Sequence, residues 1–115
     1  MKSFHDKEQE EIIKQIKDDY NRCGFDSDAD FLWIYVMKGC GCGSRDQFQE
    51  DVYNLFMAIG KKEATFELIY KDLYTELLAQ MLDSRGLLEH GSSIGGSWLS
   101  EAGKYLFSLF NKTII

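Results

Sequence analysis

The sequence predicts a mostly helical domain of the α+β class, with about five helices and a small β-hairpin near its C-terminus. Apolar residues recur at helical spacing through most of the chain, and short strand-like segments occur only beyond residue 86. The chain contains no proline, a residue that would interrupt helices. Its 115 residues, of which 44% are hydrophobic, suit a single domain, residues 1–115, with its own core.

The first expected helix covers residues 5–22 and is amphipathic. Its apolar face comprises Ile12, Ile13, Ile16 and Tyr20. The opposite face is rich in acids and lysines, as on a helix that borders solvent. The Cys23-Gly24 step ends this helix, because glycine readily adopts the conformation that closes a helix.

Three aspartates follow this helix. Asp26, Asp28 and Asp30 form the pattern D-x-D-x-D, which opens many calcium-binding loops. An EF-hand loop also requires a glycine after the third aspartate and a glutamate at its twelfth position, and this chain has neither. We therefore interpret Asp26 or Ser27 as a helix N-cap, with Asp28 and Asp30 stabilised by the dipole of the first turn.

The most apolar run of the chain is Phe-Leu-Trp-Ile-Tyr-Val-Met, residues 31–37. Its aromatic and β-branched composition suits a buried strand, whereas the capping residues before it favour a buried helix. We predict a helix. Whether it is a helix or a strand, we expect this segment to lie at the centre of the core.

The glycine-rich segment 39–43 contains Cys40 and Cys42. A C-x-C pair can ligate zinc, but zinc sites usually add a second pair, and the other candidate ligands in this chain are scattered. A reactive thiol is the second interpretation, because Arg45 could lower the pKa of a nearby thiol. We expect a connector with incidental thiols, and neither a metal nor a cofactor.

Two further helices are expected at residues 45–59 and 63–84. The apolar stripe of the first comprises Phe48, Val52, Leu55, Phe56 and Ile59. One face of the second comprises Phe66, Ile69, Tyr70, Leu73, Leu77 and Met81, and Tyr74, Leu78 and Leu82 widen it. A helix that is apolar over so much of its circumference is either central or self-associating.

The C-terminal part predicts a hairpin followed by a helix. Gly86 ends the long helix, and residues 87–90 and 97–99 are short strand candidates that enclose a loop, residues 91–96. Ser100 is the expected N-cap of the last helix, residues 101–111. We expect Leu87 and Trp98 to close the core.

This order resembles the C-terminal half of a winged-helix domain of the MarR- and PadR-like type, over residues 63–110. The matching residues are Gly86-Leu87-Leu88, the loop at residues 91–96 and Leu99-Ser100-Glu101-Ala102-Gly103. The resemblance implies that the helix before the hairpin reads the major groove of DNA. Reading DNA requires cations, yet this helix carries five acids against Lys71 alone before Arg85.

Composition excludes several classes of function. The formal net charge of −6 disfavours nucleic acid and anionic membranes as partners. The chain has no apolar run of roughly 20 residues and no secretory signal, so we expect a cytoplasmic protein. The two histidines, His5 and His90, stand in no pattern with a nucleophile, and we predict that the chain is not an enzyme.

The leading hypothesis is a non-enzymatic acidic module that binds a basic protein partner. Residues 1–30 hold nine acids against five bases, and charge complementarity steers such association. The expected partner-binding residues are Asp18, Asp19, Asp26, Asp28 and Asp30. An immunity or inhibitor protein that neutralises a nuclease toxin is one concrete form. The alternative is a winged-helix DNA-binding transcriptional regulator that forms a homodimer through its terminal helices.

Overall fold

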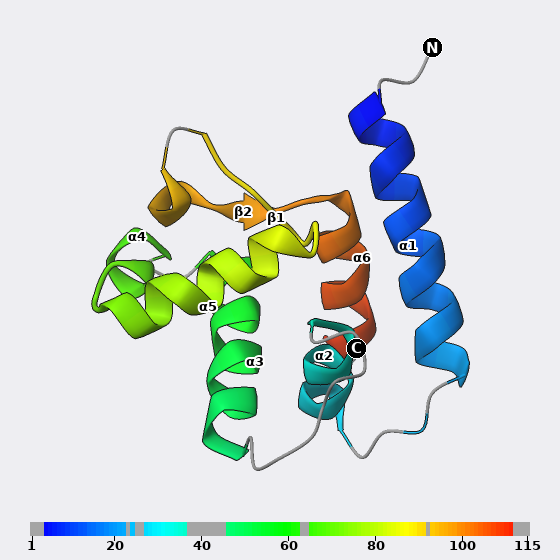
Figure 1. Cartoon of the computed structure of the whole chain (residues 1–115), viewed down its shortest axis with the longest axis horizontal. Helices are drawn as coiled ribbons and strands as arrows, with labels where there is room; N and C mark the ends of the chain where they lie inside the picture. The colour runs from blue at the N-terminus through cyan, green and yellow to red at the C-terminus, as the bar shows by residue number, and fades with distance from the viewer. Residues whose placement is uncertain are drawn as a thin grey trace.

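The computed structural model describes residues 4–22, 24, 27–36, 46–62, 65–91 and 93–111 (Figure 1). The elements in these ranges are α1 (Phe4–Arg22), α2 (Asp28–Val36), α3 (Asp46–Gly60), α4 (Thr65–Ile69), α5 (Leu73–Ser84), β1 (Leu88–Glu89), the 3-10 turn η1 (Ile94–Gly96), β2 (Trp98–Leu99) and α6 (Glu101–Phe110). The predicted fold class, mostly helical with a small C-terminal hairpin, is therefore confirmed.

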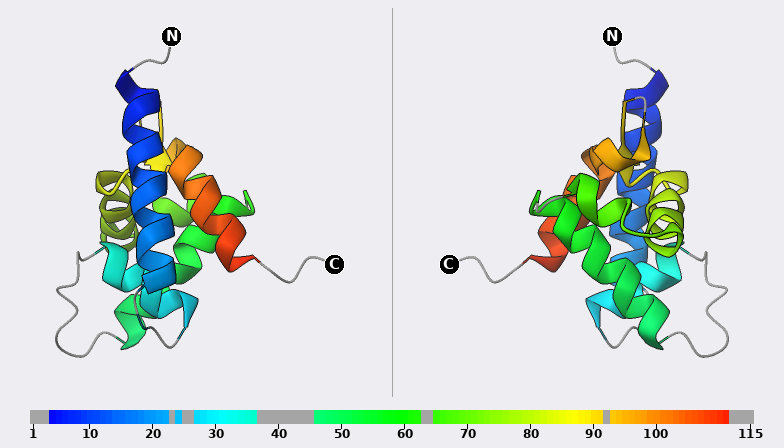
Figure 2. Two further views of the ribbon diagram at one scale, coloured as in Figure 1. Left: turned by 90° about the vertical axis from the view of Figure 1, so that its right-hand side faces the viewer. Right: turned by 90° about the vertical axis from the view of Figure 1, so that its left-hand side faces the viewer.

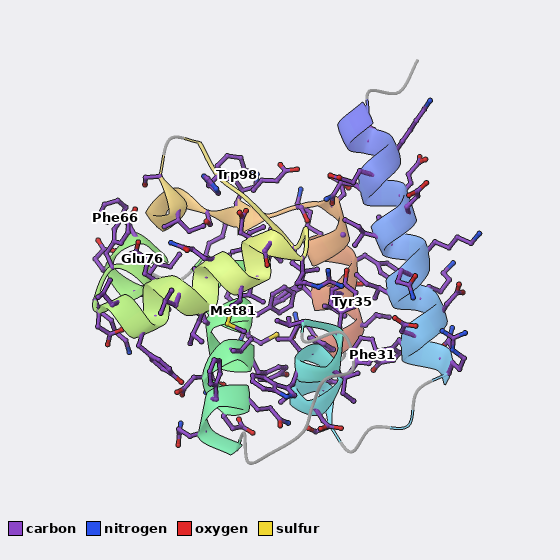
Figure 3. All side chains as sticks on the ribbon, in the orientation of Figure 1. Phe31, Tyr35, Phe66, Glu76, Met81 and Trp98 are labelled. Atoms are coloured by element: carbon purple, nitrogen blue, oxygen red, sulfur yellow. The ribbon has the colours of Figure 1, made fainter. Side chains whose placement is uncertain are left out.

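The apolar run at residues 31–37 is a helix up to Val36, as the capping residues predicted. The backbone N–H of Asp30 donates to Ser27 Oγ at 3.1 Å, so Ser27 is an N-cap, and Asp26 lies outside the described residues. Phe31 and Leu32 are fully buried. Since α2 packs against α3, its aromatic residues form the centre of the core, where Figure 3 shows Phe31 and Tyr35.

The single helix expected at residues 63–84 is wrong, because the chain breaks after Ile69 and a new helix begins at Leu73. Asp72 has an extended backbone, and its carboxylate accepts a hydrogen bond from the N–H of Thr75 at 2.8 Å. An aspartate that caps in this way competes with a continuous helix. The break changes which residues of α5 are buried, namely Thr75, Leu78, Ala79 and Leu82.

The hairpin pairs Leu88 with Leu99 and Glu89 with Trp98 in an antiparallel ladder. Leu87 is fully buried as expected, but Trp98 is 46% exposed, so its expected place in the core is wrong. Neighbouring side chains of a strand point to opposite faces. Leu99 occupies the inner face, and Trp98 therefore points outward, where its Nε1–H donates to Glu89 Oε1 at 3.3 Å.

The loop of the hairpin folds back onto α4. Its 3-10 turn η1 contacts α4, and a Cβ atom added to the buried Gly95 would collide with the ring of Tyr70. Figure 1 shows η1 and α4 next to each other at one end of the molecule. The close approach requires glycine, because any larger residue would push Tyr70 and η1 apart.

Helix α1 lies along α6, as the left view of Figure 2 shows. Gln9 joins them and is buried although it lies among the polar residues of α1. Its Nε2–H donates to the carbonyl of Gly86 at 3.1 Å, and its Oε1 accepts the N–H of Ala102 at 2.8 Å. The side chain therefore satisfies an orphan N–H in the first turn of α6 and ties three segments together.

Candidate functional site

The acids expected to bind a partner lie at the end of α1 and the start of α2. Asp18 is exposed, and Asp30 is half-buried. Asp19 accepts hydrogen bonds from Gln15 and, at 2.9 Å, from the guanidinium of Arg22. Asp28 accepts the hydroxyl proton of Tyr20 at 3.2 Å, which brings the two helix ends together.

Two of these carboxylates are thus engaged within the chain. A partner would have to compete with Arg22 for Asp19 and with Tyr20 for Asp28. An exposed ion pair contributes little to a stability or an affinity, about 0–1 kcal/mol. The acidic surface of α1 and α2 can therefore attract a basic partner, but among the described residues the exposed large hydrophobic side chains lie outside these two helices.

Of the seven large hydrophobic side chains that are exposed in the described residues, five lie elsewhere, on α4, the turn that follows it and α5. We call them the α4–α5 face: Phe66, Tyr70, Leu73, Tyr74 and Leu77. Figure 1 shows α4 and the start of α5 together on the side of the molecule away from α1, and Figure 3 places Phe66 at its outer edge. The rings of Phe66 and Tyr70 make an edge-on contact, with centroids 5.0 Å apart.

The orientation of α5 explains the exposure. Leu78 and Leu82 point into the core, and so Leu73 and Leu77, one turn apart on the opposite side, point outward. Their side chains are 76% and 57% exposed. Exposed leucines are common singly, but a continuous apolar patch marks an interaction surface. Sequence periodicity placed both leucines on the broad apolar face of one long helix, either central or self-associating. The capping preference of Asp72 could have indicated the break in that helix, but no local pattern marks which leucines the core covers.

Aromatic rings connect this face with the core through α3. Phe48 makes edge-on contacts with Trp33 and Tyr74, with ring centroids 4.9 Å and 5.9 Å apart. The hydroxyl of Tyr74 donates to Asp51 Oδ2 at 2.7 Å, and Gln47 donates to the other carboxylate oxygen at 2.9 Å. The side chain of Tyr74 is therefore held in place although it is exposed.

These hydrogen bonds set the charge at the edge of the α4–α5 face. The bond to Asp51 raises the pKa of Tyr74 to about 12. The same bond, followed by that from Gln47, holds the pKa of Asp51 below its usual value. The hydrogen bond from the backbone of Thr75 likewise lowers the pKa of Asp72. At neutral pH both aspartates are charged and Tyr74 is neutral.

A groove of about 370 Å³ runs between α3 and the α4–α5 pair. Leu55, Leu68 and Leu78 line it on the apolar side, and Asp51 and Asp72 belong to its polar side. Lys71 lies near both aspartates and lowers their pKa values slightly, as the last of several causes. The groove thus combines an apolar lining with carboxylates, and it meets the α4–α5 face at Tyr74, which belongs to both.

A second groove, of about 410 Å³, lies between α1 and the end of α5. It is lined by Glu8, Glu11 and Asp83, together with Tyr35 and Arg85. The guanidinium of Arg85 lies 5.0 Å from the ring centroid of Tyr35, and its Nε–H donates to the carbonyl of Tyr35 at 3.4 Å. Arg85 is therefore directed toward α2 and not toward the α4–α5 face.

The residues that sequence analysis considered for metal binding or catalysis are not brought together in the part of the chain that the structure describes. The described residues contain no group of three or more His, Cys, Asp or Glu side chains arranged to hold a metal ion. Cys23, Cys40 and Cys42 lie outside them. His90 Nε2 is 3.6 Å from Asp83 Oδ2, and its Nδ1 is 2.9 Å from the carbonyl of Gly91.

No family model, curated protein or solved structure matches this chain. Over the described ranges, none of the helices is both long enough and apolar enough to cross a membrane.

Proposed function

We propose that this chain is a non-enzymatic module that binds a protein partner through the α4–α5 face. The observation that carries the proposal is the exposure of Leu73 and Leu77 on a helix that has its other side in the core. Covering apolar surface contributes roughly 25 cal/mol per Å² to association. The exposed aromatic side chains Phe66, Tyr70 and Tyr74 come from the same two helices and the turn between them, and aromatic residues are enriched at the centres of protein interfaces.

The charge of the chain supports a basic partner. The formal net charge is −6, and acidic surfaces accelerate the encounter with basic proteins. In this proposal the exposed Asp18 and its neighbours on α1 and α2 contribute long-range attraction, while the α4–α5 face makes the contact. An immunity or inhibitor protein that neutralises a basic toxin is the concrete form that unites both features.

The proposal is tested by affinity capture from the native host with four tagged baits, quantified by mass spectrometry. We expect a partner to be recovered with the wild-type chain and with Asp18→Lys, and to be lost with Leu77→Asp. Ser108→Asp is the matched control, because it adds the same charge at an exposed position of α6. Circular dichroism of each bait checks that it is folded.

The reverse result would place binding elsewhere. Recovery with Leu77→Asp combined with loss in Asp18→Lys would assign the contact to the acids of α1 and α2. A partner that is recovered equally by all four baits would contradict a specific surface at both places.

A winged-helix DNA-binding regulator is the second candidate, supported by the element order α3, α4, α5, β1, β2 and α6. In such a regulator α5 would face DNA, yet it presents Leu73 and Leu77, and the acids Asp72 and Glu76 would meet phosphates. We expect no shift of a random DNA duplex in a gel at low salt. Binding that weakens steeply with added salt would favour the regulator.

A further inference from the structure

We infer that the occupant of the α4–α5 face is an amphipathic helix of a partner protein that carries arginine or lysine beside its apolar stripe. This inference rests on the proposed function and specifies the partner. It follows from the shape of the surface, from its charge, and from the poor fit of a second copy of the same chain.

The shape of the surface suits a helix. Leu73 and Leu77 form a short row along α5, and Tyr74 connects this row with the groove, which neither leucine lines. On its other side α3 borders the groove with residues at helical spacing, among them Leu55 and Ala58. Amphipathic helices bind in this way, placing apolar residues three and four positions apart against a groove between helices. The groove volume of about 370 Å³ is at the lower end of the range for ligand pockets, which suits one or two inserted side chains.

The charge of the groove favours a basic side chain. An arginine can lay its aliphatic stem on the leucines of the groove and direct its guanidinium toward carboxylates. Asp51 and Asp72 are ionised at neutral pH and line that groove together with one cation, Lys71, so the charge of its described lining is negative. Asp51 keeps its orientation through Tyr74 and Gln47, so little ordering is needed when a cation arrives.

A second copy of this chain fits less well. In a two-fold symmetric contact the same residues face each other from both copies. The described residues of α4, the following turn and the first turn of α5 include Glu67, Asp72 and Glu76 against Lys71 as the cation. A homodimer through this face would therefore bring like charges together, whereas a basic helix would neutralise them.

The inference is tested with synthetic helical peptides of about 18 residues, long enough to be partly helical alone. The first peptide has leucines three and four residues apart, flanked by arginines. The second replaces the arginines by glutamates, and the third has the composition of the first in scrambled order. Binding of each fluorescein-labelled peptide is measured by fluorescence anisotropy at low salt.

Three protein variants locate the binding. Leu77→Asp removes the apolar contact. The double variant Asp51→Asn/Asp72→Ser removes both charges and keeps a serine that can cap α5. Glu101→Gln is the matched control, because it removes one exposed carboxylate from α6, away from both surfaces.

We expect the arginine peptide to bind the wild type and the control equally. Leu77→Asp should weaken its binding about 30-fold, the effect of losing an interface anchor. The double variant should weaken it about three- to tenfold, and mainly at low salt. The glutamate and scrambled peptides should bind much more weakly than the first.

Three results would overturn the inference. Equal binding of the glutamate peptide, or an unchanged affinity of the double variant, would show that basic residues are not selected. Equal binding of the scrambled peptide would show that the net charge of the peptide, and not its amphipathic helix, explains the binding. A wild-type dimer in analytical ultracentrifugation that Leu77→Asp dissociates would make a second copy the occupant. Failure of the proposed function looks different, because partner capture itself would then be insensitive to Leu77→Asp.

Discussion

At the scale of single residues, the pair formed by Asp51 and Tyr74 sets the properties of the surface we propose to be functional. The hydrogen bond of 2.7 Å joins a carboxylate on α3 to a phenol on α5. It stabilises the charged form of Asp51 and the neutral form of Tyr74. One contact therefore keeps a negative charge at the groove and holds an aromatic ring beside the exposed leucines.

The first prediction concerns the titration of Tyr74. The difference in ultraviolet absorbance between the wild type and Tyr74→Phe should show an ionisation near pH 12. In Asp51→Asn the same difference should move toward the ordinary value of about 10, because the charged acceptor is gone. The raised pKa means that this contribution to stability is complete below pH 10 and is lost between pH 10 and 12. An ionisation near 10 in both backgrounds would contradict the hydrogen bond.

At the scale of elements, the decisive feature is the break between α4 and α5. A continuous helix over residues 63–84 would have combined the apolar residues of both parts into one broad face. Capping by Asp72 starts a new helix, and within that helix Leu78 and Leu82 are buried while Leu73 and Leu77 are exposed. The same composition thus yields one buried side and one exposed apolar side.

The second prediction uses adjacent leucines of α5. Leu78→Ala should lower the free energy of unfolding by about 2–5 kcal/mol, because it leaves a cavity in the core. Leu77→Ala should change it by less than about 0.5 kcal/mol, since that side chain is mostly in solvent. Urea denaturation of both variants measures the difference. Equal losses would show that α5 has a different rotation about its axis.

The third prediction concerns the cap at the break. Asp72→Ala should lower the melting temperature, because the N–H of Thr75 loses its acceptor. Asp72→Ser should retain most of the stability, because serine is also a good N-cap. Acid should also lower the stability, as the alanine variant does. The pKa of Asp72 is lowered in the folded state, so the charged carboxylate stabilises the fold at neutral pH. This stabilisation is lost as the pH falls through the folded-state pKa of Asp72. Identical melting of the two variants would argue against a capping role.

At the scale of the whole molecule, α1 is attached to the C-terminal part of the chain. Gln9 bonds to Gly86 and Ala102, residues that lie 77 and 93 positions away in sequence. Gly86 has a positive φ of 79° and ends the segment that carries α5, so its carbonyl is placed to accept from Gln9 and Ser100. The side chain of Gln9 therefore fixes α1 relative to both α5 and α6.

The fourth prediction tests this connection. Gln9→Ala should lower the free energy of unfolding by about 1–3 kcal/mol, because it leaves the buried N–H of Ala102 without its acceptor. Gln15→Ala is the matched control on the same helix. The side chain of Gln15 is exposed and bonds to Asp19 of the same helix, so the effect of its loss should stay below about 0.5 kcal/mol. Denaturant unfolding followed by circular dichroism measures both. A negligible effect of Gln9→Ala would mean that α1 is held by apolar contacts alone.

The sequence by itself determined the features that depend on neighbouring residues. Ser27 and Ser100 start helices and Gly86 ends one, because caps and glycines act within one turn of the chain. The apolar run at residues 31–37 was open between strand and helix, and the structure shows a helix up to Val36. The acidic net charge also follows from composition alone. The acids expected to bind a partner stay a prediction, although the structure shows that Asp19 and Asp28 already have partners within the chain.

Only the tertiary structure decided which apolar residues are left in solvent. A helix that is apolar on most sides can bury any of them, and the neighbours of α5 select Leu78 and Leu82 over Leu73 and Leu77. Gln9 is buried for a similar reason, since its partners are distant in sequence and no local pattern marks them. Periodicity reports the faces of an element, whereas packing against other elements determines the face that the core covers.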